Sequence, residues 1–248
     1  MSQLEGRRAL VTGGSRGIGR GIALAFAREG ADVAIGYRRE QAAADAVVKE
    51  IEALGRRAAA FAADVRDADA VRAMVGGARD ALGGLDVVVA NAGVPTRFQP
   101  LHEVEPGYFD RVIGIDLHGV FHTLHAALPL LREQGSGVIL TISSIAADAC
   151  GANGGPYVAA KAAVNALTKV AARENAARGV RCNVIAPGLI QTDIADGMMQ
   201  LHGEAIVRSI PLGRIGTPDE VGRLAVYLAS DEAAWITGQV FRIDGGQW

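Results

Sequence analysis

Tyr157 and Lys161 have the clearest chemical potential in the chain, because four positions separate them. On an α-helix that spacing places two side chains on the same face, where they can touch. A free phenol is a poor acid near neutral pH, but a fixed ammonium beside it stabilises the phenolate and makes the phenol a better proton donor. Ser144 offers a second hydroxyl at the end of a predicted strand. The pattern predicts proton transfer to or from an oxygen atom.

The elements that must position these side chains alternate between short apolar runs and longer helical segments. Several of the apolar runs are almost continuous Val, Ile, Leu or Ala, which is typical of parallel strands buried on both faces. We expect strands at 8–12, 32–37, 57–64, 85–90, 137–143, 180–185 and 239–244. We expect helices at 18–29, 41–54, 67–82, 106–131, 156–177 and 218–228.

This alternation predicts an α/β fold, a doubly wound seven-stranded parallel sheet with helices on both faces. No linker or repeat divides the chain, so residues 1–248 are interpreted as a single Rossmann-like domain, with residues 189–211 as a substrate-covering flap. Thr217, Pro218 and Glu220 predict a capping box at the start of the last helix.

Composition excludes several classes of protein. Of the 248 residues, 50% are hydrophobic, and the formal net charge is -2. No long charged run indicates nucleic-acid or membrane-surface binding, and no apolar run reaches the roughly 18 residues of a membrane span. Cys150 and Cys182 show no metal-ligand spacing and are interpreted as small core residues in a reducing compartment. The chain leads directly into a strand without a signal peptide, so we expect a cytoplasmic protein.

A glycine-rich segment, residues 12–19, follows the first strand and opens the first helix. Gly13, Gly17 and Gly19 allow a tight turn and let a pyrophosphate approach the helix N-terminus. Many strand–helix corners contain glycine, but at the first such junction of an α/β chain this segment predicts a dinucleotide site.

The end of the second strand indicates which dinucleotide binds. NAD-binding proteins usually place an acid there for the ribose 2′-hydroxyl, whereas this chain has Tyr37 followed by Arg38 and Arg39. Arg16 also projects from the glycine-rich segment. Arginine is well suited to a 2′-phosphate, so we predict NADP(H), with NAD(H) as a possible second cofactor. The alternative is a solvated arginine pair at a strand end.

Together these motifs resemble those of the short-chain dehydrogenase/reductase family, in its compact single-domain branch. The resemblance covers essentially the whole chain and is closest to the 3-oxoacyl-[acyl-carrier-protein] reductases. The motifs that carry it are residues 12–19, Asp64-Val65, Asn91-Ala92-Gly93, Ser144 with Tyr157-x3-Lys161, Pro187-Gly188 and residues 243–246.

The resemblance implies a role for each matching residue. Ser144 is expected to hydrogen-bond the substrate oxygen, Tyr157 to act as the acid/base, and Lys161 to bind the nicotinamide ribose and assist Tyr157. Tyr157 and Lys161 are therefore expected to contact the cofactor too. The other residues implied in cofactor binding are Gly13, Ser15, Arg16, Gly17, Ile18, Gly19, Arg38, Asp64, Val65, Asn91, Ala92, Gly93, Pro187, Gly188, Ile190 and Thr192.

One residue departs from the family pattern. Asp116 stands where the family usually has the Asn that holds a water relaying protons to the Lys, and we count it with the catalytic set. An ionised Asp accepts the same hydrogen bonds but cannot donate. Its charge would stabilise the Lys161 ammonium and weaken the help given to Tyr157, so we expect an altered pH profile.

The leading hypothesis is an NADP(H)-dependent carbonyl reductase or alcohol dehydrogenase. A sugar or polyol dehydrogenase and a non-catalytic dinucleotide sensor are the alternatives. We expect a substrate pocket formed by Ser144, Ala146, residues 94–96, Asn153 and the flap. The Leu, Ile and Met side chains of this pocket and its few charges favour an apolar ketone as substrate. The resemblance implies a homotetramer, and an acyl-carrier protein partner would need a basic patch.

Two further groups of side chains were considered. Arg132, Arg173 and Arg178 are candidates for that basic patch by count alone. His118, His122 and His125 have helical spacing, and histidines so placed can bind a metal. No Glu or Cys completes a site, so we predict no metal and expect these histidines at a subunit interface or on a solvated face.

Overall fold

The computed structural model describes residues 2–95, 97–193, 203, 205 and 207–247. Its seven strands form one sheet in the order β3-β2-β1-β4-β5-β6-β7, and each neighbouring pair is parallel. The strands are β1 (Arg8–Val11), β2 (Asp32–Tyr37), β3 (Ala58–Ala62), β4 (Val87–Ala90), β5 (Gly137–Ile142), β6 (Val180–Pro187) and β7 (Val240–Ile243). The predicted doubly wound sheet is confirmed.

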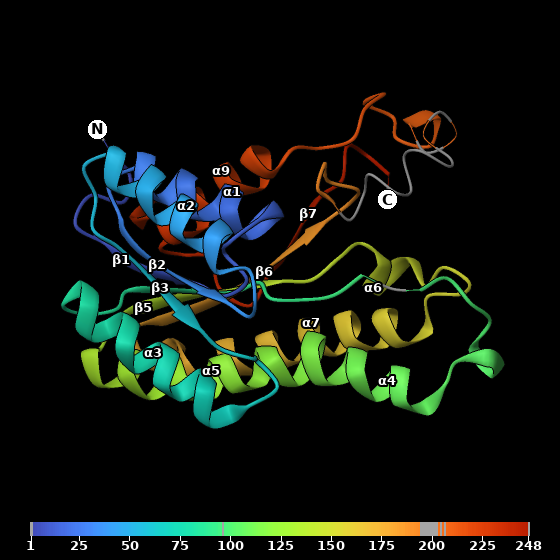
Figure 1. Cartoon of the computed structure of the whole chain (residues 1–248), viewed down its shortest axis with the longest axis horizontal. Helices are drawn as coiled ribbons and strands as arrows, with labels where there is room; N and C mark the ends of the chain where they lie inside the picture. Colours follow the sequence, from blue (N-terminus) through green and yellow to red (C-terminus); the bar gives the residue numbers. More distant parts are fainter. Residues whose placement is uncertain (1, 96, 194–202, 204, 206, 248) are drawn as a thin grey trace.

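Helices cover both faces of the sheet, as predicted (Figure 1). The face that carries Val11 and Val89 packs against α1 (Gly17–Arg28), α2 (Gln41–Ala53) and α9 (Pro218–Ala229). The face that carries Leu10 and Val88 packs against α3 (Ala68–Leu82), α5 (Gly119–Gln134) and α7 (Gly155–Asn175). These four strand residues are fully buried, and each such side chain contributes about 1.5–3 kcal/mol.

The remaining elements are short. They are α4 (Pro106–Ile113), α6 (Ala146–Ala149), the 3₁₀ turns η1 (Leu101–Glu103), η3 (Ala176–Arg178) and η4 (Asp231–Ala233), and the π-helical turn η2 (Gly114–His118). Among the described residues, no helix is both long and apolar enough to cross a bilayer.

The helix expected at 106–131 is not uniform, which corrects the prediction. The π-helical turn η2 separates α4 from α5 and adds width to the helix at that point. Gly119 follows the turn, and a Cβ there would lie 2.6 Å from Val65 Cγ2, so the widened helix also approaches the chain after β3 closely. The turn places Asp116 in the interior, where it is fully buried.

The first and last long helices pack together unusually closely. A Cβ on Gly21 would lie 2.6 Å from Pro218 Cβ, and one on Gly222 would lie 2.8 Å from Ala25 Cβ. The predicted capping box begins α9, because Thr217 Oγ1 accepts from Glu220 N and the Glu220 carboxylate accepts from Thr217 N. The close packing against α9 holds α1 in place, and with it the glycine-rich loop at the start of α1.

Candidate active site

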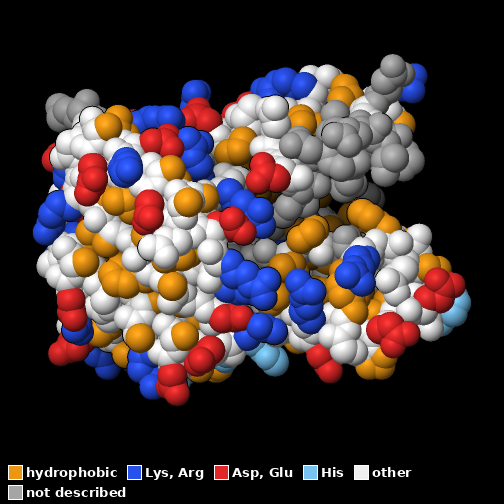
Figure 2. Space-filling view, viewed as in Figure 1, with side chains coloured by type: hydrophobic (Ala, Val, Ile, Leu, Met, Phe, Trp, Pro, Cys, Tyr) orange, Lys and Arg blue, Asp and Glu red, His pale blue; other side chains and the backbone are white. Residues whose placement is uncertain are grey.

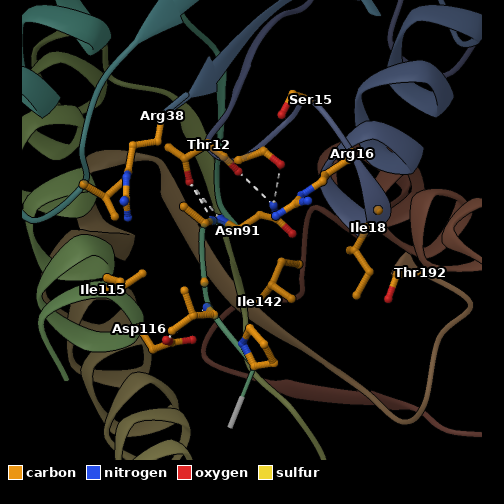
Figure 3. Close-up of a pocket in the computed structure, with 18 of the residues that line it drawn as sticks. Thr12, Ser15, Arg16, Ile18, Arg38, Asn91, Ile115, Asp116, Ile142 and Thr192 are labelled. Atoms are coloured by element: carbon orange, nitrogen blue, oxygen red, sulfur yellow. Dashed lines mark hydrogen bonds between the residues drawn. The ribbon is translucent and has the colours of Figure 1, made fainter. Parts of the chain in front are cut away.

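A cavity of about 530 Å³ lies at the carboxyl edge of the sheet, where β1 and β4 are neighbours and the strand order reverses. Open α/β sheets bind ligands at such a point. Figure 3 shows side chains from the β1, β4 and β5 ends converging on it. All residues expected to act in catalysis or cofactor binding line this cavity.

The glycine-rich loop forms one wall of the cavity, and part of its backbone has the positive φ angles that favour glycine. Gly13 and Gly17 have φ angles of 65° and 55°. A Cβ on Gly13 would also lie 2.9 Å from Ala92 Cα. Arg16 at the N-cap of α1 makes no side-chain capping bond and the first turn has no acid, so the helix N-terminus offers its N–H groups to an anion.

Thr12 and Asn91 join this loop to the end of β4 (Figure 3). The Thr12 hydroxyl accepts from Asn91 N at 3.0 Å and from Ala92 N at 3.1 Å. Asn91 Nδ2 donates to Thr12 O at 2.8 Å. Thr12 was not among the predicted site residues, although its hydroxyl at the end of a strand beside the loop is a signal that could have identified it.

Four arginines, Arg16, Arg38, Arg39 and Arg111, contribute to the cavity lining. Figure 2 shows Lys and Arg side chains gathered beside the central hollow in this view of the molecule. Arg38 Nε lies 3.7 Å from the Asp64 carboxylate, whereas Arg66 contacts the same carboxylate at 2.6 Å. The hydrogen bond from Arg66 outweighs burial and lowers the pKa of Asp64 to about 2. Arg39 is exposed at the cavity rim.

Ser144, Tyr157 and Lys161 also line the cavity. Ser144 follows β5, and its Oγ accepts from Ala146 N at 3.1 Å, at the start of α6. Tyr157 is in the first turn of α7, after Pro156, and Lys161 follows one turn later. Lys161 Nζ lies 5.5 Å from the centre of the Tyr157 ring and donates to Ile142 O at 3.1 Å.

Asp116 reaches Lys161 from the π-helical turn. Its Oδ1 lies 3.1 Å from Lys161 Nζ, and its Oδ2 accepts from Val94 N at 3.2 Å. Burial alone would lower the pKa of Lys161, but the attraction of the Asp116 carboxylate, assisted by Tyr157, outweighs it and raises that pKa above its usual value. Lys161 therefore keeps its charge at neutral pH.

The expected substrate pocket is only partly reproduced. Val94 and Leu189 line the cavity, whereas Ala146 and Asn153 are not among its lining residues. Thr96 and residues 194–202, 204 and 206 of the flap lie outside the described residues.

The arginines considered for a carrier-protein patch lie elsewhere, which corrects that hypothesis. Arg132 is near the end of α5 and Arg173 near the end of α7, and Arg178 directly precedes β6. The starts of β5 and β6 define the amino edge of the sheet, opposite the cavity. Arg132 donates to Asn175 Oδ1 at 2.8 Å, a contact between helix ends.

His118, His122, His125 and both cysteines are not among the residues that line the cavity. His122 Nδ1 is 2.9 Å from Val65 O, and His118 and His125 are exposed. Cys182 is buried, as expected, but Cys150 is exposed, so its assignment to the core was wrong. Cys150 ends α6 in the left-handed conformation with φ 50°, which turns the chain toward solvent.

A family model described as "Enoyl-(Acyl carrier protein) reductase" matches residues 13–247. The chain is 44% identical to a Staphylococcus aureus protein named 3-oxoacyl-[acyl-carrier-protein] reductase FabG, over 98% of both chains. It is 43% identical to a 3-oxoacyl-[acyl-carrier-protein] reductase of Synechocystis, over 99% of this chain and 98% of that protein.

Solved structures show the same architecture. A putative short-chain alcohol dehydrogenase from Sinorhizobium meliloti superposes with a TM-score of 0.94 at 38% identity, covering 99% of this chain and 97% of that one. A short chain dehydrogenase from Burkholderia cenocepacia, solved in complex with NADP, superposes with a TM-score of 0.92 at 39% identity and covers 99% of each chain.

Proposed function

Because the chain belongs to the short-chain dehydrogenase/reductase family, we propose that it is an NADP(H)-dependent oxidoreductase that interconverts a carbonyl and a secondary alcohol. One observation carries this proposal: Ser144, Tyr157 and Lys161 line the same cavity as the glycine-rich loop. A sensor of dinucleotides would need the loop but not the three side chains.

The cavity suits a dinucleotide phosphate. Gly13 and Gly17 bring backbone to the cavity surface without a side chain, and the start of α1 is open to an anion. Arg38 and Arg39, which follow β2, line the cavity together with Arg16, and their charge would suit a ribose 2′-phosphate. This charge supports NADP(H) over NAD(H), and the NADP named in the Burkholderia structure agrees with it.

The proposed chemistry divides between the cofactor and the chain. When bound, the cofactor supplies the hydride in reduction or accepts it in oxidation. Ser144 donates a hydrogen bond to the substrate oxygen and orients it. Tyr157 gives its proton to that oxygen as negative charge develops there, and in the reverse direction takes one from the alcohol. Lys161 holds its positive charge beside the phenol ring.

The substrate side favours an apolar carbonyl compound. Val94, Pro95 and Leu189 line the cavity. Phe98, at 63% exposure, lies on the segment after Pro95, and Leu101, at 68%, begins η1. An acyl thioester on a carrier protein, as in the names of the relatives, fits such a surface. A sugar or polyol would require more polar groups, and it remains the alternative substrate class.

We further propose a homotetramer that acts in the cytoplasm, as the family resemblance implies. Phe121 on α5 and Val170 on α7 are half-exposed apolar side chains on the two helices that the family uses for subunit packing. Analytical ultracentrifugation of the purified chain tests the assembly.

A substrate screen tests the activity. NADPH oxidation is followed with ketones, 3-oxo esters, 3-oxoacyl thioesters, 2-enoyl thioesters and sugars, each repeated with NADH. We expect turnover of 3-oxo thioesters or ketones with NADPH. Turnover of enoyl thioesters alone would contradict carbonyl reduction, and NADPH binding without turnover of any compound would favour the sensor.

A further inference from the structure

A buried ion pair lies directly behind the proton donor. Asp116 is fully buried and Lys161 is 4% exposed, and 3.1 Å separates Lys161 Nζ from Asp116 Oδ1. Either charge would be strongly disfavoured in this interior without the other. A charge pair in this position must affect the phenol that shares a helix face with Lys161.

We propose that Asp116 is a positioning residue that holds the Lys161 ammonium and the backbone of Gly93 and Val94 in one arrangement, and that it sets the pH range over which Tyr157 exchanges its proton. This inference rests on the proposed function, because it concerns the same reaction.

The geometry connects the cofactor loop to the proton-donor helix. One Asp116 oxygen faces Lys161 on α7, and the other accepts the Val94 N–H at 3.2 Å. A Cβ on Gly93 would lie 2.7 Å from Asp116 Oδ1 and 3.5 Å from Lys161 Nζ. The chain after β4 therefore covers the ion pair at a distance that a larger residue would not allow. Movement of Asp116 would therefore displace both the Lys161 ammonium and the backbone of Gly93 and Val94.

The carboxylate controls the charge state of Lys161. Burial opposes the ammonium, and the attraction of Asp116 more than compensates, so the pKa of Lys161 is raised. Tyr157 is the other group that acts on it. The end of β5 contributes neutral groups, the Ile142 carbonyl at 3.1 Å and Ser143, whose Oγ donates to Lys161 O.

Several titratable groups on the other elements that pack against α7 have partners of their own, whereas Arg111 on α4 lines the same cavity as Lys161. Asp148 on α6 pairs with Arg242 at 2.8 Å, and His122 on α5 contacts Val65 O. Arg181 on β6 donates to Leu228 O at 2.9 Å. On α4, Tyr108 Oη accepts from Arg97 N, and Asp110 and Arg111 are exposed. Within the described part of the chain, Asp116 is thus the carboxylate paired with Lys161.

The sign of the effect follows from the net charge of the pair. Lys161 with Asp116 carries no net charge and attracts the Tyr157 phenolate less than a lone ammonium would. Asp116→Asn removes the negative charge at nearly constant shape and leaves an oxygen to accept from Val94 N. The phenolate should then form at lower pH. In alcohol oxidation, where Tyr157 accepts a proton, the acidic limb of the rate profile should move down by about 1 pH unit.

The first experiment compares the pH dependence of kcat and kcat/KM for alcohol oxidation in the parent and in Asp116→Asn. His118→Asn is the matched control, because it alters an exposed residue of the same π-helical turn. We expect the Asp116→Asn profile to shift to lower pH with little change in KM for NADP⁺, and the His118→Asn profile to overlay the parent. Overlay of all three profiles would overturn the proposal.

A second measurement does not depend on turnover. In protein labelled with [¹³C]lysine, the Lys161 side-chain signal should titrate at lower pH in Asp116→Asn than in the parent, because the burial penalty is no longer offset. An unchanged Lys161 titration would overturn the proposal for Asp116, even if no alcohol is oxidised. Absence of turnover alone would instead count against the proposed function. If Asp116→Asn does not fold, Gly93→Ala replaces it, because the added methyl group displaces the Asp116 carboxylate sterically. This variant should shift the same Lys161 signal. An unshifted signal would overturn the proposal.

Discussion

Lys161 Nζ lies 5.5 Å from the centre of the Tyr157 ring and also donates to the carbonyl of Ile142, the last residue of β5. The charged group beside the phenol is therefore fixed to the sheet as well as to its own helix. Ser144 follows two residues after Ile142, so the same strand end locates both the ammonium and the second hydroxyl. The groups proposed to transfer the proton are therefore anchored at the carboxyl end of β5.

Tyr157→Phe should lower kcat for carbonyl reduction by about 10²- to 10⁴-fold, because the phenol oxygen is the proposed proton donor. The ring remains, so the dissociation constant of NADPH, measured by nicotinamide fluorescence, should change little. Tyr227→Phe on α9 is the matched control and should keep full activity. An active Tyr157→Phe enzyme would exclude the proposed mechanism.

Replacing Arg38 and Arg39 together by Gln should weaken NADPH binding by about 10- to 100-fold, which corresponds to the loss of a hydrogen bond to a charged group. NADH lacks the 2′-phosphate and should bind nearly as before. Arg72→Gln, an exposed arginine paired with Asp69 on α3, is the control. Equal weakening of both cofactors would show that these arginines do not contact the 2′-phosphate.

Alkylation should distinguish the two cysteines. Burial raises the pKa of Cys182 to about 12, only partly opposed by Arg181, so at pH 8 it is a protonated thiol inside the core. Iodoacetamide reacts with the thiolate, and Cys150 is exposed. Mass spectrometry of the folded protein should show one modified residue, Cys150, and a second only after denaturation. Rapid labelling of Cys182 would mean that β6 opens readily.

The capping box of α9 should contribute a pH-dependent stability. The hydrogen bond from Arg214, with that from Thr217 N, lowers the pKa of Glu220 from its ordinary 4.5 to about 2. Because the folded-state pKa is the lower one, the stabilisation is present above pH 4.5 and is lost as the pH falls toward 2.

Thermal or urea unfolding measures this contribution. At pH 7, Glu220→Gln should cost less than about 1 kcal/mol, because the pair is largely exposed. Thr217→Ala should cost about 1 kcal/mol. The difference between Glu220→Gln and the parent should shrink on acidification. Glu174→Gln, at an exposed position on α7, should unfold like the parent at every pH.

Much of this arrangement could be predicted from the sequence, because local patterns determine it. Apolar runs identified the seven strands, and glycines identified the loop at the start of α1. The predicted site residues lie around one cavity because parallel strands present their carboxyl ends at the same edge.

The π-helical turn and the exposure of Cys150 could not be predicted, since tertiary packing decides both. Residues 106–131 have an ordinary helical pattern, and the widening at Gly114–His118 accompanies two tertiary contacts, of Asp116 with Lys161 and of Gly119 with Val65. The placement of Arg132 and Arg173 was equally hidden, because a count of arginines says nothing about which edge of the sheet they reach.

The close contact between α1 and α9 has a consequence for how the protein is made. The predicted cofactor loop lies at residues 12–19, but the helix it opens packs against Pro218 and Gly222, which are far away in the sequence. During synthesis α1 therefore lacks one of its packing partners until residues 218–229 have left the ribosome. A nascent chain stalled before residue 218 would have the glycine-rich sequence but not the packed helix that gives the loop its shape.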